Sequence, residues 1–335
     1  MDSASDERFS VLGSPSLAFG SAGAFRLPEA RQRRRLFDAA YDAGFRHFDV
    51  APMYGMGQAE GELSALLKKR GSTVTVTTKF GIDASVFGRA VGKVQGPIRR
   101  VLAAKPSMNT DLQKAASGPA SSIAGRLLYR PTGFSQEAAR KSLRRSLQAL
   151  GRGTIELFIL HDPLPHEMTF AERDGTISYL EEERASGRIG NWGVAVHDPR
   201  LTGDGASLIN QAPFLQFRDH LFLPPPPTMT SSQVATYGAL AGALPRIEQF
   251  FAADPRARQR WVDELDLTES GPRSLASVIL RETTRRNPFG PVLFTTTKPH
   301  RLQPAMEAIA FNAPLDESAR ISQLVADVID RGAGA

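Results

Sequence analysis

Four residues of complementary chemistry lie in the sequence at points where short apolar runs end. They are an acid, a phenol, an ammonium and an imidazole, namely Asp49, Tyr54, Lys79 and His161. A tyrosine has an ordinary pKa of about 10 and is a poor acid at neutral pH unless a nearby cation favours its phenolate. Lys79 can supply that cation, Asp49 can hold the lysine in an ion pair, and His161 can hydrogen-bond the tyrosine or a substrate oxygen. The set predicts proton transfer to an oxygen.

The sequence around these residues predicts a repeated unit of strand, loop and amphipathic helix. Residues 10–22 predict a β-hairpin followed by a first strand, and seven more strands are expected at residues 46–50, 74–78, 156–160, 191–196, 214–217, 233–237 and 292–295. Helices are expected at residues 29–43, 58–70, 135–150, 171–186, 274–286 and 299–311, with a short one after Asp198. Eight strands alternating with helices over about 250 residues favour a closed (β/α)8 TIM barrel over an open sheet.

The carboxyl ends of the strands gather at one mouth of a parallel barrel, and functional groups lie in the loops that follow them. The four residues are therefore expected to converge at that mouth. No linker interrupts the alternation, so residues 1–335 are expected to form a single barrel domain. Arg218 and Asp219, at another expected strand end, could meet an acidic or polyhydroxylated substrate there.

The composition is that of a globular chain, with 41% apolar and 23% charged residues among 335. The chain has no cysteine, which excludes disulfides, thiolate catalysis and cysteine-ligated metal sites. The first residues, MDSASDERFS, lack the apolar region of a signal peptide, and no run approaches the roughly 18 apolar residues of a membrane span. We therefore expect a cytoplasmic protein.

The net charge of +6 is concentrated in one segment. Residues 82–134, which follow the expected third strand, hold eight basic and two acidic residues, so the rest of the chain carries no net charge. Because this insertion would leave the barrel beside Lys79, we interpret it as a basic loop or lid that attracts cofactor phosphates, an acidic substrate or an acidic partner protein. A solvated loop without a ligand is the alternative. Nucleic-acid binding is not predicted, because the aromatic residues of the segment are not interleaved with its basic ones.

A metal site is not predicted either. His161 and His166 are five residues apart with Pro163 and Pro165 between them, so they share no helical face. The residues after His166 lack the second histidine of a zinc protease motif.

The motifs around the four chemistry-bearing residues resemble the aldo-keto reductase superfamily. The resemblance is carried by FRHFDVAPMYGMGQAEGELSALLKKRGSTVTVTTKFG, which begins at Phe45, and by IELFILHDP, which begins at Ile155. They follow the family pattern of a Phe-Asp-x-Ala strand end with Tyr-Gly soon after, a Thr-Lys strand end, and a strand that ends in His. Together with the segment GFSQEAARKSLRRSLQALG, these two segments are most similar in sequence to the aldose and galactose dehydrogenase branch of the family.

The resemblance implies a (β/α)8 oxidoreductase with Asp49, Tyr54, Lys79 and His161 as its catalytic tetrad. It further implies hydride transfer between C4 of a nicotinamide and the carbonyl carbon of an aldehyde, ketone or sugar-like substrate, or the reverse oxidation of an alcohol, with Tyr54 as proton donor. The alternative is a regulatory or binding protein on the same barrel that holds the cofactor with little turnover.

By the same resemblance the cofactor is NADP(H), bound near the last strands. Its contacts fall on Gln216, Tyr237, Thr295, Thr296, Lys298 and Arg301. In the family pattern the glutamine lies near the nicotinamide amide, the tyrosine stacks on the ring, and the last four positions bind the 2′-phosphate.

The chain departs from the family pattern at four positions. Ala195 and Val196 replace the Ser and Asn that bond the nicotinamide amide, and Pro304 and Ala305 replace a Glu and an Asn that bind adenine. Each lost hydrogen bond costs about 1 kcal/mol. The substitutions predict weaker cofactor binding and leave the choice between NADP and NAD open.

Overall fold

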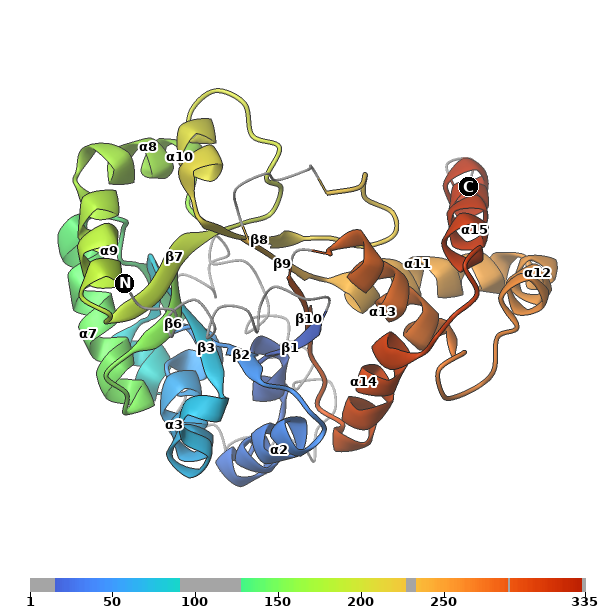
Figure 1. Cartoon of the computed structure of the whole chain (residues 1–335), viewed down its shortest axis with the longest axis horizontal. Helices are drawn as coiled ribbons and strands as arrows, with labels where there is room; N and C mark the ends of the chain where they lie inside the picture. The colour runs from blue at the N-terminus through green and yellow to red at the C-terminus, as the bar shows by residue number, and fades with distance from the viewer. Residues whose placement is uncertain (1–15, 91–127, 227–232, 289, 333–335) are drawn as a thin grey trace.

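A computed structural model describes residues 16–90, 128–226, 233–288 and 290–332 (Figure 1). Eight strands close into a barrel in the order β1, β10, β9, β8, β7, β6, β3, β2, and each pairs in parallel with both neighbours. The strands are β1 (Ser16–Gly20), β2 (His47–Asp49), β3 (Thr75–Phe80), β6 (Ile155–His161), β7 (Ile189–Val196), β8 (Phe214–Arg218), β9 (Gln233–Tyr237) and β10 (Pro291–Phe294). The predicted (β/α)8 barrel is confirmed.

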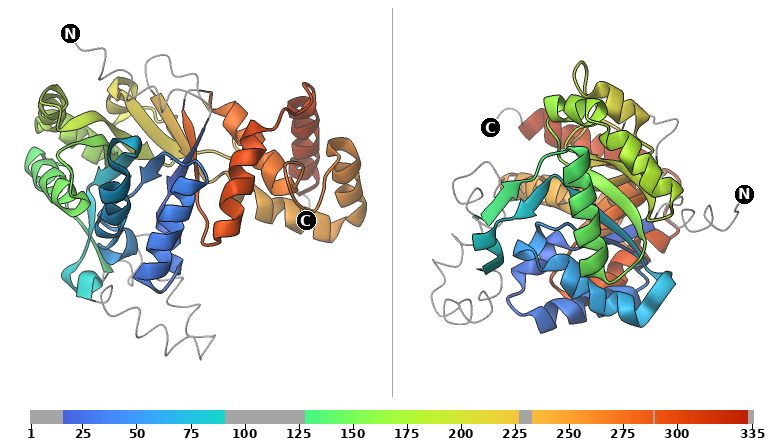
Figure 2. Two further views of the ribbon diagram at one scale, coloured as in Figure 1. Left: turned by 60° about the horizontal axis from the view of Figure 1, so that its bottom comes forward. Right: turned by 90° about the vertical axis from the view of Figure 1, so that its left-hand side faces the viewer.

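Helices lie around the barrel and to one side of it (Figures 1 and 2). They are α2 (Ala30–Asp42), α3 (Ala59–Arg70), α7 (Gln136–Leu150), α8 (Pro165–Arg173), α9 (Thr176–Ala185), α10 (Ala206–Gln211), α11 (Ala239–Ala253), α12 (Pro255–Leu265), α13 (Leu275–Arg286), α14 (Leu302–Ala310) and α15 (Glu317–Gly332). Short 3-10 turns are η1 (Ala22–Arg26), η2 (Tyr54–Met56), η3 (Gly71–Thr73) and η4 (Pro299–Arg301). None of the helices in the described ranges is long and apolar enough to cross a membrane.

Most predicted elements are present, and a few stretches differ. The helix expected at residues 171–186 is instead two helices, α8 and α9, because the chain takes a left-handed conformation at Gly175 (φ 78°) between them. The helix expected at residues 299–311 starts with the η4 turn before α14. Helices α11, α12 and α15 are additional to the prediction. The predicted hairpin ahead of β1 lies outside the described residues.

Apolar side chains fill the barrel below its mouth. They include Leu157, Ile159, Ala195, Phe214 and Ala235. Because side chains alternate between the two faces of a strand, the inward face of β6 continues from Ile159 to His161 and that of β8 from Phe214 to Gln216. His161 pairs with Ala195, and Ala195 with Gln216, across adjacent strands. The apolar filling therefore ends in the layer where the predicted site residues begin.

A second apolar core lies beside the barrel, where α11, α12, α13 and α15 pack together (Figures 1 and 2). Trp261 of α12 is buried there with Ile247 of α11 and Ile321 of α15. Arg281 of α13 donates to both carboxylate oxygens of Glu317, at 2.5 and 2.9 Å, and both side chains are buried. This ion pair holds α15 against α13. We call the group formed by α11, α12, α13 and α15 the helical side lobe.

Replacing Glu317 by glutamine is expected to destabilise the chain at neutral pH by about 3 kcal/mol, because Arg281 would be left buried without its carboxylate. Burial opposes ionisation of Glu317, but hydrogen bonds and charges from Arg281 and Arg285 lower its pKa below the ordinary value. A lowered pKa in the folded state means that the stabilisation is present at neutral pH and is lost as the pH falls through that pKa. In urea unfolding, the difference between wild type and Glu317→Gln should therefore shrink in acid. Equal unfolding free energies at neutral pH would contradict the assignment.

A small hairpin lies outside the barrel at the root of the basic insertion. Strand β4 (Ile82–Ala84) pairs antiparallel with β5 (Tyr129–Pro131), so the two ends of the insertion lie side by side. Residues 91–127 lie outside the described ranges. The interpretation of residues 82–134 as a lid within one barrel domain of residues 1–335 stays a prediction.

Candidate active site

The structure brings the four chemistry-bearing residues together at the carboxyl ends of β2, β3 and β6. The Lys79 ammonium lies 2.5 Å from Oδ2 of Asp49 and also donates to the carbonyl of Val50 at 3.2 Å. Lys79 and Asp49 are only 1% and 2% exposed, so the ion pair is screened from water. The same ammonium lies 5.3 Å from the centre of the Tyr54 ring, and the His161 ring packs edge-on against Tyr54 at 5.8 Å.

Tyr54 is positioned by a turn whose backbone conformation is uncommon. Gly55, Met56 and Gly57, which follow it, all have positive φ angles. A Cβ on Gly55 would lie 2.1 Å from the ring of Phe25, so this position requires glycine for its backbone conformation and for its close contact. The Tyr-Gly pair of the motif therefore has a local structural reason.

The pKa of Tyr54 differs from the expectation that Lys79 lowers it. Burial raises the pKa of Tyr54 well above its ordinary value, and Asp49, Tyr237 and Asp162 raise it further. Asp49, 2.5 Å from the Lys79 ammonium, offsets part of that cation's attraction for a phenolate, so the effect of burial prevails. Tyr54 consequently keeps its proton at neutral pH.

His161 is a neutral imidazole. Burial, and then the charge of Lys79, lower the pKa of His161 to about 3. Burial also lowers the pKa of Lys79, while its contact with Asp49 opposes that shift. The Nδ1 atom of His161 is buried and has no hydrogen-bond partner in the described part of the chain. A buried ring nitrogen without a partner costs free energy, which a ligand could recover by bonding to it.

Gln216 and Tyr237 line the part of the mouth formed by β8 and β9. Strand β8 lies opposite β2 in the barrel, and the Gln216 side-chain nitrogen donates across it to Oδ2 of Asp49 at 2.8 Å. The Tyr237 hydroxyl lies 3.4 Å from Nδ1 of His197. Burial is the main reason why the pKa of Tyr237 is raised to about 12. Gln216 is thus joined to Lys79 through the Asp49 carboxylate.

The residues predicted to bind a 2′-phosphate follow β10. The backbone nitrogen of Lys298 donates to the Thr296 hydroxyl at 3.0 Å, which shapes the turn before η4. Thr295, Lys298 and Arg301 are exposed, and no ion pair within the described ranges involves either cation. No acidic residue occurs between Thr295 and Met306. This end of the barrel therefore presents uncompensated positive charge where α14 begins.

The sequence interpretation missed Asp162. It directly follows His161 with a left-handed backbone (φ 52°), and its charge raises the pKa values of Tyr54 and Tyr237. Asp162 also lies 3.7 Å from His197. Its signal in the sequence was its place directly after the histidine at an expected strand end.

Asp219 does not face a substrate, contrary to the sequence interpretation. It is buried, and Arg286 of α13 donates to it at 2.7 Å and to the carbonyl of Leu223 at 2.9 Å. Asp219 therefore holds the loop after β8 in place. Its neighbour Arg218 remains exposed at the strand end.

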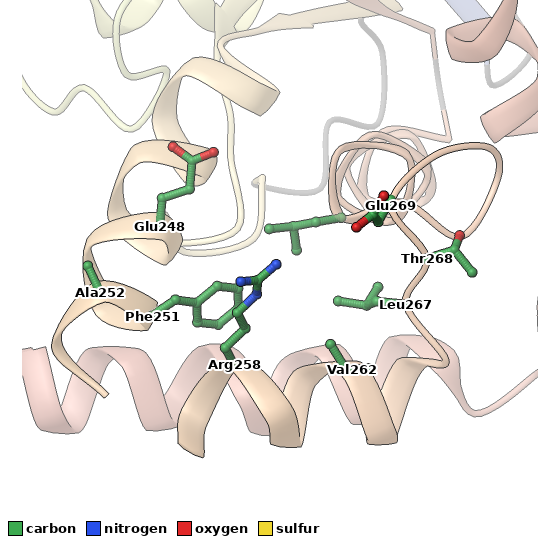
Figure 3. A pocket seen from close by; sticks show the side chains of 9 residues that line it. Glu248, Phe251, Ala252, Arg258, Val262, Leu267, Thr268 and Glu269 are labelled. Atoms are coloured by element: carbon green, nitrogen blue, oxygen red, sulfur yellow. The ribbon is translucent and has the colours of Figure 1, made fainter. Parts of the chain in front are cut away.

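A cavity of about 580 Å³ lies in the helical side lobe (Figure 3). Its lining comes from α11, α12, the loop after α12 and the start of α13, and combines apolar Phe251, Val262 and Leu267 with the exposed Arg258. It contains none of the predicted site residues, so it is separate from the barrel mouth. Across the described ranges, no three His, Asp or Glu side chains are grouped so as to hold a metal ion.

Residues 16–203 match the model of the aldo/keto reductase family. The match covers more than half of the chain and includes Asp49, Tyr54, Lys79 and His161. The chain belongs to the aldo/keto reductase family, and the resemblance seen in its sequence motifs is confirmed.

Two characterised relatives match part of the chain. It is 31% identical over 188 residues to a D-threo-aldose 1-dehydrogenase from a Pseudomonas species, which covers 55% of this chain and 50% of the relative. It is 28% identical over 177 residues to a pyridoxal 4-dehydrogenase from Microbacterium luteolum, which covers 50% of this chain and 47% of the relative. The chain thus spans about half the length of the relatives that it matches.

Solved structures share the fold at low sequence identity. The holo form of an aldo-keto reductase from Bacillus halodurans aligns with a TM-score of 0.64 at 15% identity, over 93% of this chain and 91% of that one. A glycerol dehydrogenase from Gluconobacter oxydans aligns with a TM-score of 0.64 at 19% identity, over 93% of this chain and 92% of that one. These likenesses establish the fold.

Proposed function

We propose that the chain is an NADP(H)-dependent oxidoreductase that transfers a hydride between the nicotinamide and the carbonyl or alcohol carbon of a small aldehyde, ketone or sugar-like substrate. The observation that carries this proposal is the buried ion pair of Lys79 and Asp49 beside the ring of Tyr54. The family membership and the relatives named as aldose and pyridoxal dehydrogenases support the class of reaction and of substrate.

Tyr54 is the proton donor in this proposal. Its raised pKa keeps the phenol protonated at neutral pH, which is the form that carbonyl reduction requires. As negative charge develops on the substrate oxygen, the Tyr54 proton moves to it, and the Lys79 ammonium stabilises the phenolate left behind. Asp49 fixes that ammonium, and Gln216 in turn holds Asp49.

His161 orients the substrate oxygen. Because its ring is neutral, it can offer one hydrogen bond without adding a charge that would compete with Lys79. Its edge-on packing against Tyr54 fixes the direction of the ring relative to the phenol. Its buried Nδ1, which no described residue hydrogen-bonds, is consistent with a group that awaits a ligand.

The residues at the mouth fit a nicotinamide dinucleotide. When bound, the cofactor supplies the hydride at C4 of its ring. Tyr237 would stack on the nicotinamide and Gln216 would lie by its amide. The exposed cations after β10, which have no ion-pair partner among the described residues, fit a 2′-phosphate. Its contacts would come from Thr295, Thr296, Lys298 and Arg301. The buried side chains of Ala195 and Val196 offer no hydrogen bond to the amide, so binding relies more on the phosphate end.

Replacing Arg301 by alanine is expected to weaken NADPH binding by roughly tenfold or more, since a charge-assisted hydrogen bond to phosphate would be lost. NADH lacks the 2′-phosphate, so its affinity should not change. Fluorescence-quenching titrations with both cofactors measure this, with Arg144→Ala, an exposed arginine on α7, as the matched control. Equal affinity of the wild type for NADPH and NADH would refute the phosphate role.

Steady-state NADPH oxidation with a panel of aldehydes, ketones and aldoses tests the proposed activity. Turnover with at least one carbonyl compound is the expected result. Tight NADPH binding without turnover on any of them would instead favour the alternative of a cofactor-bound regulatory protein. A cytoplasmic location and an acidic partner for the insertion stay predictions of the sequence.

A further inference from the structure

A small cavity lies between the β4–β5 hairpin and α7, at the root of the basic insertion. Its volume is about 260 Å³, below the range of about 300–1,000 Å³ typical of sites for drug-sized ligands, so it suits a small chemical group. The polar side chains that line it are Asp83, Arg130, Thr132, Lys141, Ser142 and Arg145. Lys141 and Arg145 are one turn apart on α7 and therefore share a face of that helix.

Positive charge exceeds negative charge in this cavity. Arg130, Lys141 and Arg145 bring three cations, against the single carboxylate of Asp83 among the described residues that line it. The register of the hairpin places Arg130 directly opposite Asp83. Even so, no ion pair within the described ranges involves Arg130 or Lys141.

Asp83 is not available to neutralise these two cations, because other donors already occupy it. Arg89 donates to both of its carboxylate oxygens, at 2.6 and 2.7 Å, and Arg145 donates to Oδ2 at 3.2 Å. The backbone nitrogen of Ala84 donates to Oδ1 at 2.7 Å. The carboxylate is buried, and it holds Arg145 at the wall of the cavity. Within the described part of the chain, no carboxylate is therefore left to compensate the charges of Arg130 and Lys141.

We propose that this cavity binds a phosphate group, either as the free ion or as the phosphate of a small phosphomonoester. Two unpaired cations and the hydroxyl groups of Thr132 and Ser142 form a donor set that suits the oxygens of a dianion. This site is distinct from the cations that follow β10, because β1 and β2 separate β10 from β3 in the barrel.

The cavity is linked to the turn that carries Tyr54. A Cβ on Gly57 would lie 3.2 Å from Cγ of Arg89 and 3.4 Å from Cβ of Ala84, so the base of the hairpin rests against that turn. Arg89 also forms an ion pair with Asp83. A phosphate bound beside Asp83 is therefore separated from the Tyr54 turn by one side chain.

Calorimetric titration of the full chain with inorganic phosphate, against chloride at matched ionic strength, tests the proposal. The titrations use an Arg301→Ala background, which removes one of the two cations after β10 and weakens any phosphate binding there. Saturable binding is expected, with an affinity that Lys141→Ala lowers by roughly tenfold or more. Arg144→Ala, which removes an exposed cation of α7 that does not line the cavity, should leave the affinity unchanged, and Lys141→Arg should retain most of it.

Two results would overturn the proposal. One is the absence of saturable phosphate binding in the Arg301→Ala background. The other is an equal effect of Lys141→Ala and Arg144→Ala, which would indicate attraction by surface charge alone. A parallel titration with a sugar phosphate identifies the source of the group: tighter binding than inorganic phosphate indicates a phosphomonoester, and equal or weaker binding indicates the free ion.

Discussion

Replacing Tyr54 by phenylalanine is expected to lower the rate of carbonyl reduction by about 10²–10⁴-fold, the range that general acid catalysis contributes. The substitution removes the hydroxyl alone. The ring that packs against His161 and lies beside Lys79 stays in place, so the turn and the buried ion pair should be preserved. Single-turnover and steady-state rates with NADPH measure the loss, and cofactor affinity should match that of the wild type.

The pH dependence gives this prediction a second readout. Because the pKa of Tyr54 is raised, the phenol holds its proton across the neutral range, so reduction should vary little with pH there. Oxidation of an alcohol needs the phenolate as base, so its rate should rise by about tenfold per pH unit below that pKa. An oxidation rate that falls with rising pH, or a Tyr54→Phe variant with the wild-type rate, would rule out Tyr54 as the proton donor.

Replacing Lys79 by methionine should have the second largest effect, on both stability and activity. Methionine fills similar space but leaves the buried Asp49 carboxylate without its cation, which costs about 3–5 kcal/mol of unfolding free energy. The proposed phenolate of Tyr54 also loses its stabilising charge. Urea unfolding and NADPH-dependent carbonyl reduction measure the two effects separately.

The double variant Asp49→Asn/Lys79→Met separates the structural role of the pair from its chemical role. Removing both charges eliminates the uncompensated carboxylate, so much of the lost stability should return. Activity should stay low, because no ammonium remains beside Tyr54. A stable and fully active Lys79→Met variant would show that the pair has no part in the reaction.

The convergence of the four residues could be predicted because it follows from topology. Parallel strands in a closed barrel bring their carboxyl ends to one mouth, so placing Asp49, Lys79 and His161 at strand ends was sufficient. The helix expected from residue 135 also begins at a local signal, because the Ser135 hydroxyl accepts from the backbone nitrogen of Ala138 as an N-cap. These features depend on neighbouring residues and on the order of elements.

The features that escaped prediction depend on contacts between distant segments. Pro245 lies inside α11, and this helix-breaking signal obscures a helix that packing in the side lobe stabilises. Pro255 instead begins α12, at a position where proline is compatible with a helix. Asp219 is buried because Arg286, far along the chain, reaches it. The raised pKa of Tyr54 follows mainly from its burial, which depends on contacts between distant segments that no sequence pattern supplies.

Transfer of deuterium from NADPH labelled at C4 of the nicotinamide tests the central claim most directly. Mass spectrometry of the alcohol product, formed from a carbonyl compound of the panel, measures the transfer. With the wild-type chain the label should appear on the former carbonyl carbon, and with Tyr54→Phe it should appear far more slowly, although the cofactor still binds. No labelled product with any carbonyl compound, or equal rates for the two proteins, would contradict the proposed mechanism.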